Sequence, residues 1–193
     1  MIKYLKVNRF YKFRQWVLSE LNKIYKYIIY KIFKRKKSYK DAIIYISEKY
    51  KRIIIAPYYF NKDGIIYEQD TCYVYDINID NETLGREIIN ALNKFGYNNK
   101  SIANNKLIDW PAFKFSDLKT VKSFKEYYTY ISIRDENGIL IFYIEYPINN
   151  KFGDGKKIAD IQNNTNNFDI GKKIREIYKM SEEDVEMILG NIK

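Results

Sequence analysis

The chain has 193 residues, 46% hydrophobic and 17% aromatic, so it can bury a core and is not a disordered polypeptide. It has no histidine and one cysteine, which excludes Ser-His and Cys-His catalysis, cysteine zinc sites and internal disulfides. Residues 1–39 carry 12 Lys and Arg against one acidic residue, a net of +11, whereas the remainder has a net of −1, giving the total of +10.

Residues 1–37 contain no glycine or proline and are predicted to form one long basic amphipathic helix, separate from a domain over 38–193. Its apolar residues Leu21, Tyr25, Ile28 and Ile32 alternate spacings of four and three, as in a helix–helix seam. Four interpretations stay open: packing on the domain, contact with an anionic membrane surface, nucleic-acid binding and self-association. The residues predicted to contact a membrane or another anion are Lys23, Lys26, Lys34, Arg35, Lys36 and Lys37.

Two apolar segments after the helix predict a hairpin. Asp41–Ser47 and Arg52–Ala56 read as strands, and the second is apolar enough to be buried on both faces. We expect Pro57 to end it, since proline cannot donate to a sheet ladder. The polar turn Asn61–Gly64 then leads into another strand-like segment, Ile65–Ile79.

A helix is predicted next. Asp80, Asn81 and Thr83 offer capping oxygens, and apolar residues at spacings of three and four define one helical face. These apolar residues are Leu84, Ile88, Ala91, Leu92 and Phe95. Gly96 is expected to cap the helix, and 97–105 is expected to be a loop.

Three carboxylates of the strand before this helix, Glu68, Asp70 and Asp76, have the same parity and would share one face of an unbroken strand. Such a face could hold Mg²⁺, but we expect it to be the solvated side of a half-buried strand, with no metal.

Cys72 is expected to be a core thiol. The lone thiol and the lack of a signal peptide or of an apolar run of about 18 residues predict a cytoplasmic protein.

The second half of the chain predicts a hairpin and two helices. Leu107–Phe115 is expected to lie extended with Trp110 as its anchor, and Ser116–Lys125 to form a helical turn. Asn137-Gly138 joins strands Tyr127–Arg134 and Ile139–Ile148. In the first strand Thr129, Ile131 and Ile133 alternate with Tyr130, Ser132 and Arg134, which predicts one wet face, whereas 139–144 has none and is expected nearer the sheet centre. A short strand over Ile158–Ile161 and helices from Asp169 and Ser181 follow.

A short motif with a glycine in the first turn recurs at the starts of two predicted helices. Gly85 in TLGREI and Gly171 in DIGKKI occupy the first turn, where glycine costs about 1 kcal/mol against alanine. Glycine is favoured there if the backbone approaches another element closely, and we expect that element to be the sheet. Phosphate binding at a helix start is the alternative.

The order APYYF, acidic-Gly turn, YVYDI and LGREIINAL resembles the immunity proteins of bacterial contact-dependent growth inhibition systems. The resemblance extends more loosely from Ser38 to the C-terminus. It implies a small cytoplasmic protein that is not an enzyme. Such a protein binds and blocks the C-terminal toxin domain of a secreted exoprotein, and it needs no cofactor, metal or small-molecule substrate. Some relatives bind by accepting a toxin hairpin at a sheet edge.

If the toxin is a nuclease, its basic cleft would be covered by carboxylates and tyrosines, which supply electrostatic steering and rigid contact area. The predicted toxin-binding residues are Tyr58, Tyr59, Asp63, Glu68, Asp70, Tyr73 and Tyr75.

The predicted fold is α+β: a mostly antiparallel, twisted sheet of about five or six strands with packed helices, plus the N-terminal helix. The alternative function is membrane or nucleic-acid binding through that helix.

Overall fold

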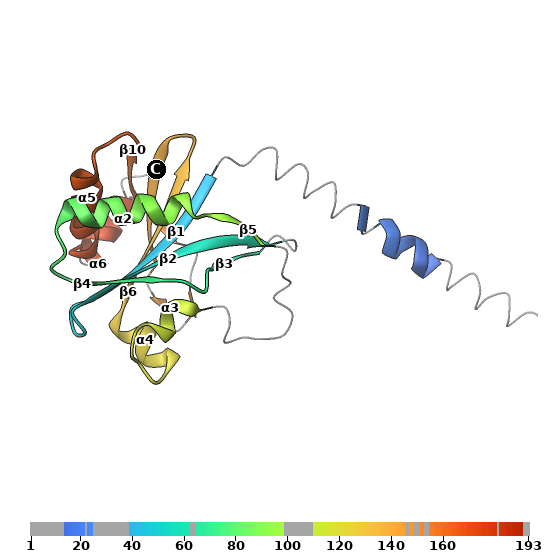
Figure 1. Ribbon diagram of the computed structural model, residues 1–193, viewed down its shortest axis with the longest axis horizontal. Coiled ribbons are helices and arrows are strands. Elements are labelled where there is room, and N and C mark those ends of the chain that lie inside the picture. Colours follow the sequence, from blue (N-terminus) through green and yellow to red (C-terminus); the bar gives the residue numbers. More distant parts are fainter. Residues whose placement is uncertain are drawn as a thin grey trace, which may run out of the picture.

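The computed structural model describes residues 14–21, 23–24, 39–61, 65–98, 110–145, 147–148, 151–152, 155–180 and 182–190 (Figure 1). Of the predicted N-terminal helix, residues 14–21 and 23–24 are helical, and the rest of 1–37 lies outside the described residues. The apolar side chains of Trp16, Leu18, Leu21 and Ile24 are 50–60% exposed. In its described part, this helix therefore does not bury an apolar face on the domain.

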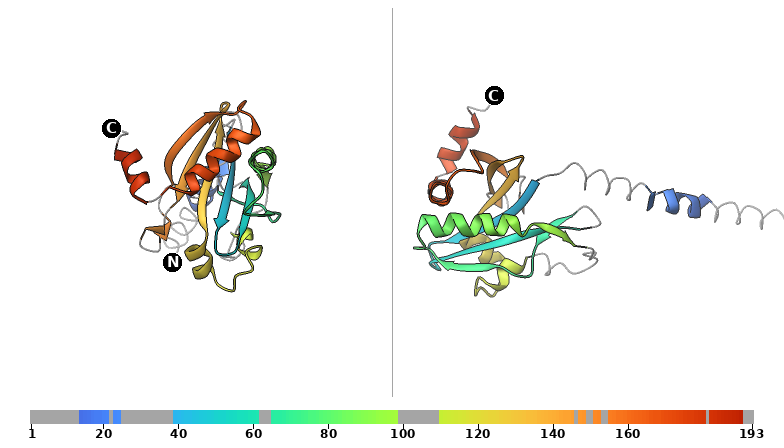
Figure 2. Two further views of the ribbon diagram at one scale, coloured as in Figure 1. Left: turned by 90° about the vertical axis from the view of Figure 1, so that its left-hand side faces the viewer. Right: turned by 45° about the horizontal axis from the view of Figure 1, so that its top comes forward.

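The domain is built on an eight-stranded, mostly antiparallel sheet with helices on both faces, as the α+β prediction requires (Figures 1 and 2). The strand order is β10-β7-β6-β1-β2-β3, with β4 and β5 also paired to β2. The strands are β1 (Tyr39–Ser47), β2 (Arg52–Asn61), β3 (Ile66–Glu68), β4 (Tyr73–Asp76), β5 (Gly96–Asn98), β6 (Thr129–Glu136), β7 (Ile139–Glu145) and β10 (Lys156–Gln162). A separate pair is formed by β8 (Pro147–Ile148) and β9 (Lys151–Phe152).

Pro57 does not end β2, contrary to expectation, because it stands where the strand changes partners. Up to Pro57, β2 pairs with β1 and β4, and beyond it the strand pairs with β3 and, in parallel, with β5. The missing N–H of proline therefore falls where the ladder to β1 stops. The Pro57 carbonyl oxygen accepts a hydrogen bond of 2.7 Å from the Gln69 N–H.

The predicted strand Ile65–Ile79 is two short strands, β3 and β4, that pair with different halves of β2. The buried side chain of Gln69 lies at the break and donates to the carbonyl oxygens of Tyr58 (3.1 Å) and Lys94 (2.6 Å). Because the strand is broken, Glu68, Asp70 and Asp76 do not share one strand face, and the parity argument fails.

Helices α2 (Asn81–Asn93), α5 (Asn167–Tyr178) and α6 (Glu182–Gly190) pack on the first face of the sheet. Asp80 caps α2 as predicted, its carboxylate accepting from the Thr83 N–H at 2.8 Å. Asn166 caps α5, which therefore begins before Asp169. At the other end of α2, Lys94 is the C-cap, so Gly96 is not a cap and instead opens β5. Figures 1 and 2 show α2 and α5 side by side.

Helices α3 (Pro111–Lys114) and α4 (Val121–Tyr127) cover part of the second face, opposite α2 (Figure 1). The expected extended segment is thus helical after Trp110, with Pro111 at the first helical position where its missing N–H costs nothing. Trp110 packs on Phe124 and Tyr130, with ring centroids 5.9 and 6.2 Å apart, as a core residue would.

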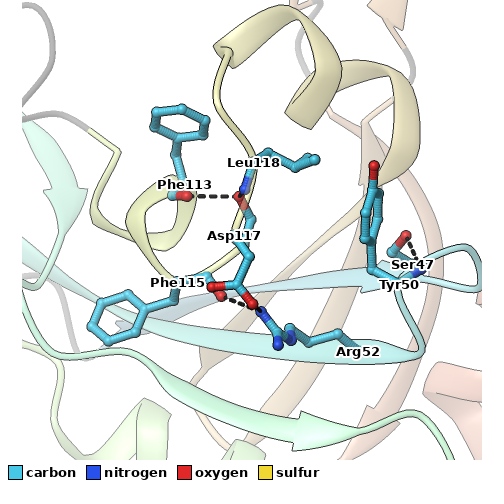
Figure 3. Close-up of polar contacts among 8 residues, drawn as sticks. Ser47, Tyr50, Arg52, Phe113, Phe115, Asp117 and Leu118 are labelled. Atoms are coloured by element: carbon cyan, nitrogen blue, oxygen red, sulfur yellow. Dashed lines mark hydrogen bonds and ion pairs between the residues drawn. The ribbon is translucent and has the colours of Figure 1, made fainter.

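Arg52 of β2 fixes the segment between α3 and α4 to the end of the sheet (Figure 3). Its Nη1 donates to the Phe115 carbonyl oxygen at 3.0 Å and to the Asp117 carboxylate. Asp117 has a φ of +59°, the left-handed conformation that short polar residues tolerate in turns. In the same turn the Ser116 hydroxyl donates to the Phe113 carbonyl oxygen at 2.6 Å.

The Asn137-Gly138 hairpin is confirmed, with φ values of 53° and 85° that suit a two-residue turn between β6 and β7. The position of β7 differs from expectation, because it lies between β6 and β10 and is farther from the centre than β6. Ile141 and Tyr143 are half-buried on its second-face side. That side of β7 is therefore partly open.

Candidate functional site

The predicted binding residues follow β2, β3 and β4, and the structure divides them between the two faces of the sheet. Tyr58 lies on the second face and Tyr59 on the first, since successive strand residues point to opposite sides. The Tyr59 ring contacts that of Tyr67, with centroids 5.7 Å apart. Asp63 lies outside the described residues. Tyr58 and Tyr59 therefore do not belong to one contact surface.

Glu68 corrects the expectation of an exposed acidic face, because its side chain is only 2% exposed. Its carboxylate accepts hydrogen bonds from the Tyr45 hydroxyl and from the Ala112 N–H, the latter at 2.7 Å. Burial raises the pKa of Glu68 to about 7, although both hydrogen bonds act to lower it. Glu68 thus links β3 to α3 inside the protein and cannot touch a partner directly.

Asp70 is exposed, whereas Tyr73 and Tyr75 are half-buried beside α2. The Lys94 ammonium donates to the Tyr73 hydroxyl and lies 4.6 Å from the Tyr73 ring centroid. The Tyr75 hydroxyl donates to the Glu87 carboxylate at 3.0 Å, and burial together with this bond raises the pKa of Tyr75 to about 12. Helix α2 therefore fixes both tyrosines in position, with part of each side chain exposed.

A cavity of about 430 Å³ opens on the second face, and none of its lining residues comes from α3 or α4. It crosses β3, β2, β1, β6 and β7, and its floor includes an ion pair. The side chains that matter are Asp41, Tyr58, Ile66, Ser132, Arg134 and Tyr143. Its volume lies within the range of about 300–1,000 Å³ found for ligand sites.

The ion pair joins Arg134 of β6 to Asp41 of β1. Arg134 Nε donates to Asp41 Oδ1 at 2.8 Å, and Nη2 donates to Oδ2 at 3.0 Å. The guanidinium carbon lies 4.7 Å from the centroid of the Tyr39 ring. The hydrogen bonds that Arg134 donates to Asp41 raise the pKa of Arg134, so this side chain carries a full positive charge.

Sequence reasoning finds part of this cavity. Tyr58 is among the predicted binding residues, and the alternation in β6 predicts Ser132 and Arg134 on a wet face. It also predicts Tyr130 there, wrongly, since α4 covers that end of the strand and leaves Tyr130 1% exposed. Asp41 and Tyr143 are missed, because no local pattern indicates that Asp41 pairs with a residue 93 positions away.

The described part of the chain offers few other groups that could act as nucleophiles or metal ligands. Cys72 is buried, and burial raises the pKa of its thiol well above the usual value, so it is a poor nucleophile. Among the described residues, no three Cys, His, Asp or Glu side chains cluster as metal ligands would.

No described helix is both long enough and apolar enough to cross a membrane. Of the predicted membrane contacts, Lys23 is described and pairs with Glu20, and the others lie outside the described residues.

The fold is similar to those of two solved structures. One is a protein of unknown function from Neisseria meningitidis, with 17% identity and a TM-score of 0.55 over 72% of this chain and 93% of that chain. The other is a chain of the CdiA-CT/CdiI toxin and immunity complex from Yersinia pseudotuberculosis, with 9% identity and a TM-score of 0.55 over 72% and 94%. No family model and no curated protein matches the sequence.

Proposed function

We propose that this chain is an immunity protein that binds the toxin domain of a contact-dependent growth inhibition system and covers its active site. The observation that carries the proposal is the fold, which matches 94% of a chain from a toxin and immunity complex. The segments that resemble such immunity proteins form β2, β4 and α2, the core of one side of the domain.

Inhibition by occlusion suits the residues available. The chain has no histidine, its one thiol is buried, and its described carboxylates do not cluster as a metal site. The domain over 38–193 instead offers a rigid sheet with a half-open second face and partly exposed tyrosines. Rigid tyrosines lose little entropy on binding and are enriched at protein interfaces.

The proposed partner is the C-terminal toxin domain of a secreted exoprotein, acting as a nuclease in the cytoplasm of the target cell. The exposed Asp70 supplies acidic charge toward its basic cleft, Asp63 adds a second carboxylate to the same stretch of sequence, and Glu68 supports the adjoining strand from inside. The contact residues proposed are Tyr59, Tyr73 and Tyr75 on the first face, together with Asp63 and Asp70, whereas Tyr58, on the second face, would belong to a separate contact.

The test is co-expression with the toxin domain encoded beside this chain. We expect the chain to restore growth of cells that express this toxin domain and to co-purify with it in a stable complex. An unrelated toxin domain of the same class serves as the control, since immunity is specific to the cognate pair. Continued toxicity together with no complex between soluble proteins would reject the proposal.

A second candidate function is supported by the helical residues 14–21 and 23–24. Its exposed Trp16, Leu18, Leu21 and Ile24 stand in a segment of 39 residues with a net charge of +11, a combination that favours anionic lipid surfaces. Flotation of the full chain with phosphatidylserine vesicles, but not with pure phosphatidylcholine vesicles, is the expected result. Leu21→Asp with Ile24→Asp should abolish it, whereas unchanged flotation or binding only to nucleic acid contradicts the lipid assignment.

A further inference from the structure

The cavity on the second face presents a positive charge to solvent although its ion pair is neutral overall. The Asp41 side chain is 7% exposed and that of Arg134 is 34% exposed, so the guanidinium is the accessible member. Both Asp41 oxygens accept a bond from Arg134, which directs the carboxylate toward the protein. A ligand entering the cavity therefore meets the cation first, and an anionic group is favoured.

Arg134 has donors left for such a group. A guanidinium carries five N–H groups, and Asp41 takes one on Nε and one on Nη2. Among the residues the structure describes, the two N–H groups of Nη1 and the second of Nη2 have no hydrogen-bond partner. The Nη1–Nη2 edge matches the spacing of carboxylate oxygens, so it can bind a second carboxylate with two parallel bonds.

The neighbours of Arg134 complete a mixed polar and aromatic wall. Tyr143 is the cross-strand neighbour of Ser132, and both line the cavity together with Arg134. Tyr58 and Ile66 form the opposite wall, and both are half-buried. Ile141, the cross-strand neighbour of Arg134 on the same face, is also half-buried. Arginine and tyrosine, together with tryptophan, are the residues most enriched at protein-binding hot spots.

The ion pair itself points to recognition more than to stability. Removing two charges from water costs about as much as their attraction returns, and an apolar pair of the same volume often stabilises a fold better. Asp41 instead fixes the guanidinium in one orientation, and the Tyr39 ring supports it from one side at 4.7 Å. An arginine oriented before binding loses less entropy when a partner arrives.

We propose that this cavity receives an acidic side chain of the toxin domain, whose carboxylate binds the Nη1–Nη2 edge of Arg134 between Tyr58 and Tyr143. The inference rests on the proposed function and names a contact surface for it. A toxin is favoured over a free small acid, because Ile66 in the cavity lining and Ile141, the cross-strand neighbour of Arg134, are half-buried apolar residues that a small acid would leave uncovered.

The experiment measures the affinity of the full chain for the purified toxin domain by calorimetry. Arg134→Lys keeps the charge beside Asp41 but removes the planar edge, so binding should weaken about 10- to 100-fold, as for a lost charge-assisted hydrogen bond. The double variant Asp41→Asn with Arg134→Gln removes both charges without leaving either unpaired, and it should weaken binding at least as much. Thermal unfolding of each variant identifies any loss of fold.

Arg86→Lys is the matched control, because Arg86 is an exposed arginine on α2 that also pairs with a carboxylate, that of Glu87 at 3.2 Å. It should bind the toxin as the wild type does. Folded Arg134 variants with affinities within twofold of the wild type would overturn the inference while leaving the proposed function intact.

A separate titration uses succinate as the probe for a free acid. If succinate binds the wild type but not Arg134→Lys, and the variant binds the toxin as tightly as the wild type does, the cavity is a small-molecule site. That result would overturn the toxin assignment. Failure of the wild type to bind the toxin at all would reject the proposed function, and this inference with it.

Discussion

Gly85 of α2 packs directly on the backbone of Asn167 at the start of α5, so that a Cβ atom at Gly85 would lie 1.9 Å from the Asn167 carbonyl oxygen. The relationship is reciprocal, since a Cβ atom at Gly171 of α5 would lie 2.1 Å from the carbonyl oxygen of Asn81. The two helices thus exchange equivalent contacts at their first turns. The predicted close approach is correct, but the neighbour is a helix and not the sheet.

Gly85→Ala and Gly171→Ala should each destabilise the domain by roughly 2–3 kcal/mol in urea unfolding. Alanine alone would favour a helix by about 1 kcal/mol, but here the methyl group meets rigid backbone and must separate α2 from α5. Gly96→Ala is the control, because its nearest neighbour would be 3.6 Å away, an ordinary contact. A Gly85→Ala protein as stable as the wild type would show that the helices do not approach this closely.

Glu68 should make the domain less stable as pH rises. Its pKa is raised to about 7 in the folded state from 4.5, so the folded state holds its proton more tightly. That contribution is fully present below about pH 4.5 and is lost as pH rises through about 7, amounting to roughly 3 kcal/mol at 1.36 kcal/mol per pKa unit.

The variant Glu68→Gln isolates this effect, because its side chain does not titrate while other carboxylates still do. We expect the unfolding free energy of the wild type minus that of the variant to fall between pH 4.5 and pH 8, measured by urea unfolding at several pH values. A difference that stays constant across this range would mean that Glu68 is solvated in the folded protein.

Arg52→Ala should loosen the layer formed by α3 and α4 without unfolding the sheet. The substitution removes the bonds to the Phe115 carbonyl oxygen and to Asp117, which is itself 72% exposed, so the stability loss should be only about 1 kcal/mol. Amide hydrogen exchange should accelerate within residues 111–127 and stay unchanged in β1 and β6. Lys51→Ala, at the exposed neighbouring position, is the control, and equal exchange in both variants would contradict the anchoring role.

Local patterns in the sequence identify most strands and helices but not their partners. The Asn137-Gly138 turn, the Asp80 cap and the apolar face of α2 are each encoded within a few residues, and all three are found. The continuation of β2 through Pro57 is not encoded locally, because it depends on pairing with β5, which follows α2 in the chain. Secondary-structure propensity considers Pro57 by itself, so it cannot predict that β2 exchanges one set of partner strands for another at this residue.

The candidate site was harder to predict, because burial depends on which part of each face the helices cover. Glu68 looks like a surface acid in sequence, and it becomes a core residue because α3 supplies the Ala112 N–H above it. Arg134 and Tyr130 have the same parity on β6, but α4 covers only the Tyr130 end. Alternation therefore assigns residues to faces, and only the tertiary packing separates core from cavity.

Asp70 provides the remaining test of the toxin interface, because it is exposed and its substitution should not disturb the core. Asp70→Asn should slow association with the toxin domain by about two- to fivefold and reduce its dependence on salt, since an exposed charge acts mainly through long-range steering. Dissociation should change little. Stopped-flow association rates at several ionic strengths measure both effects.

Glu183→Gln on α6 is the matched control for Asp70→Asn, because it removes one exposed negative charge from another element and so changes the net charge equally. If both variants slow association alike, the effect comes from total charge and Asp70 has no special position. If neither does, the toxin does not approach β3 and β4. Slower association for Asp70→Asn alone, combined with faster dissociation for Arg134→Lys, would assign steering to the strand edge and anchoring to the cavity.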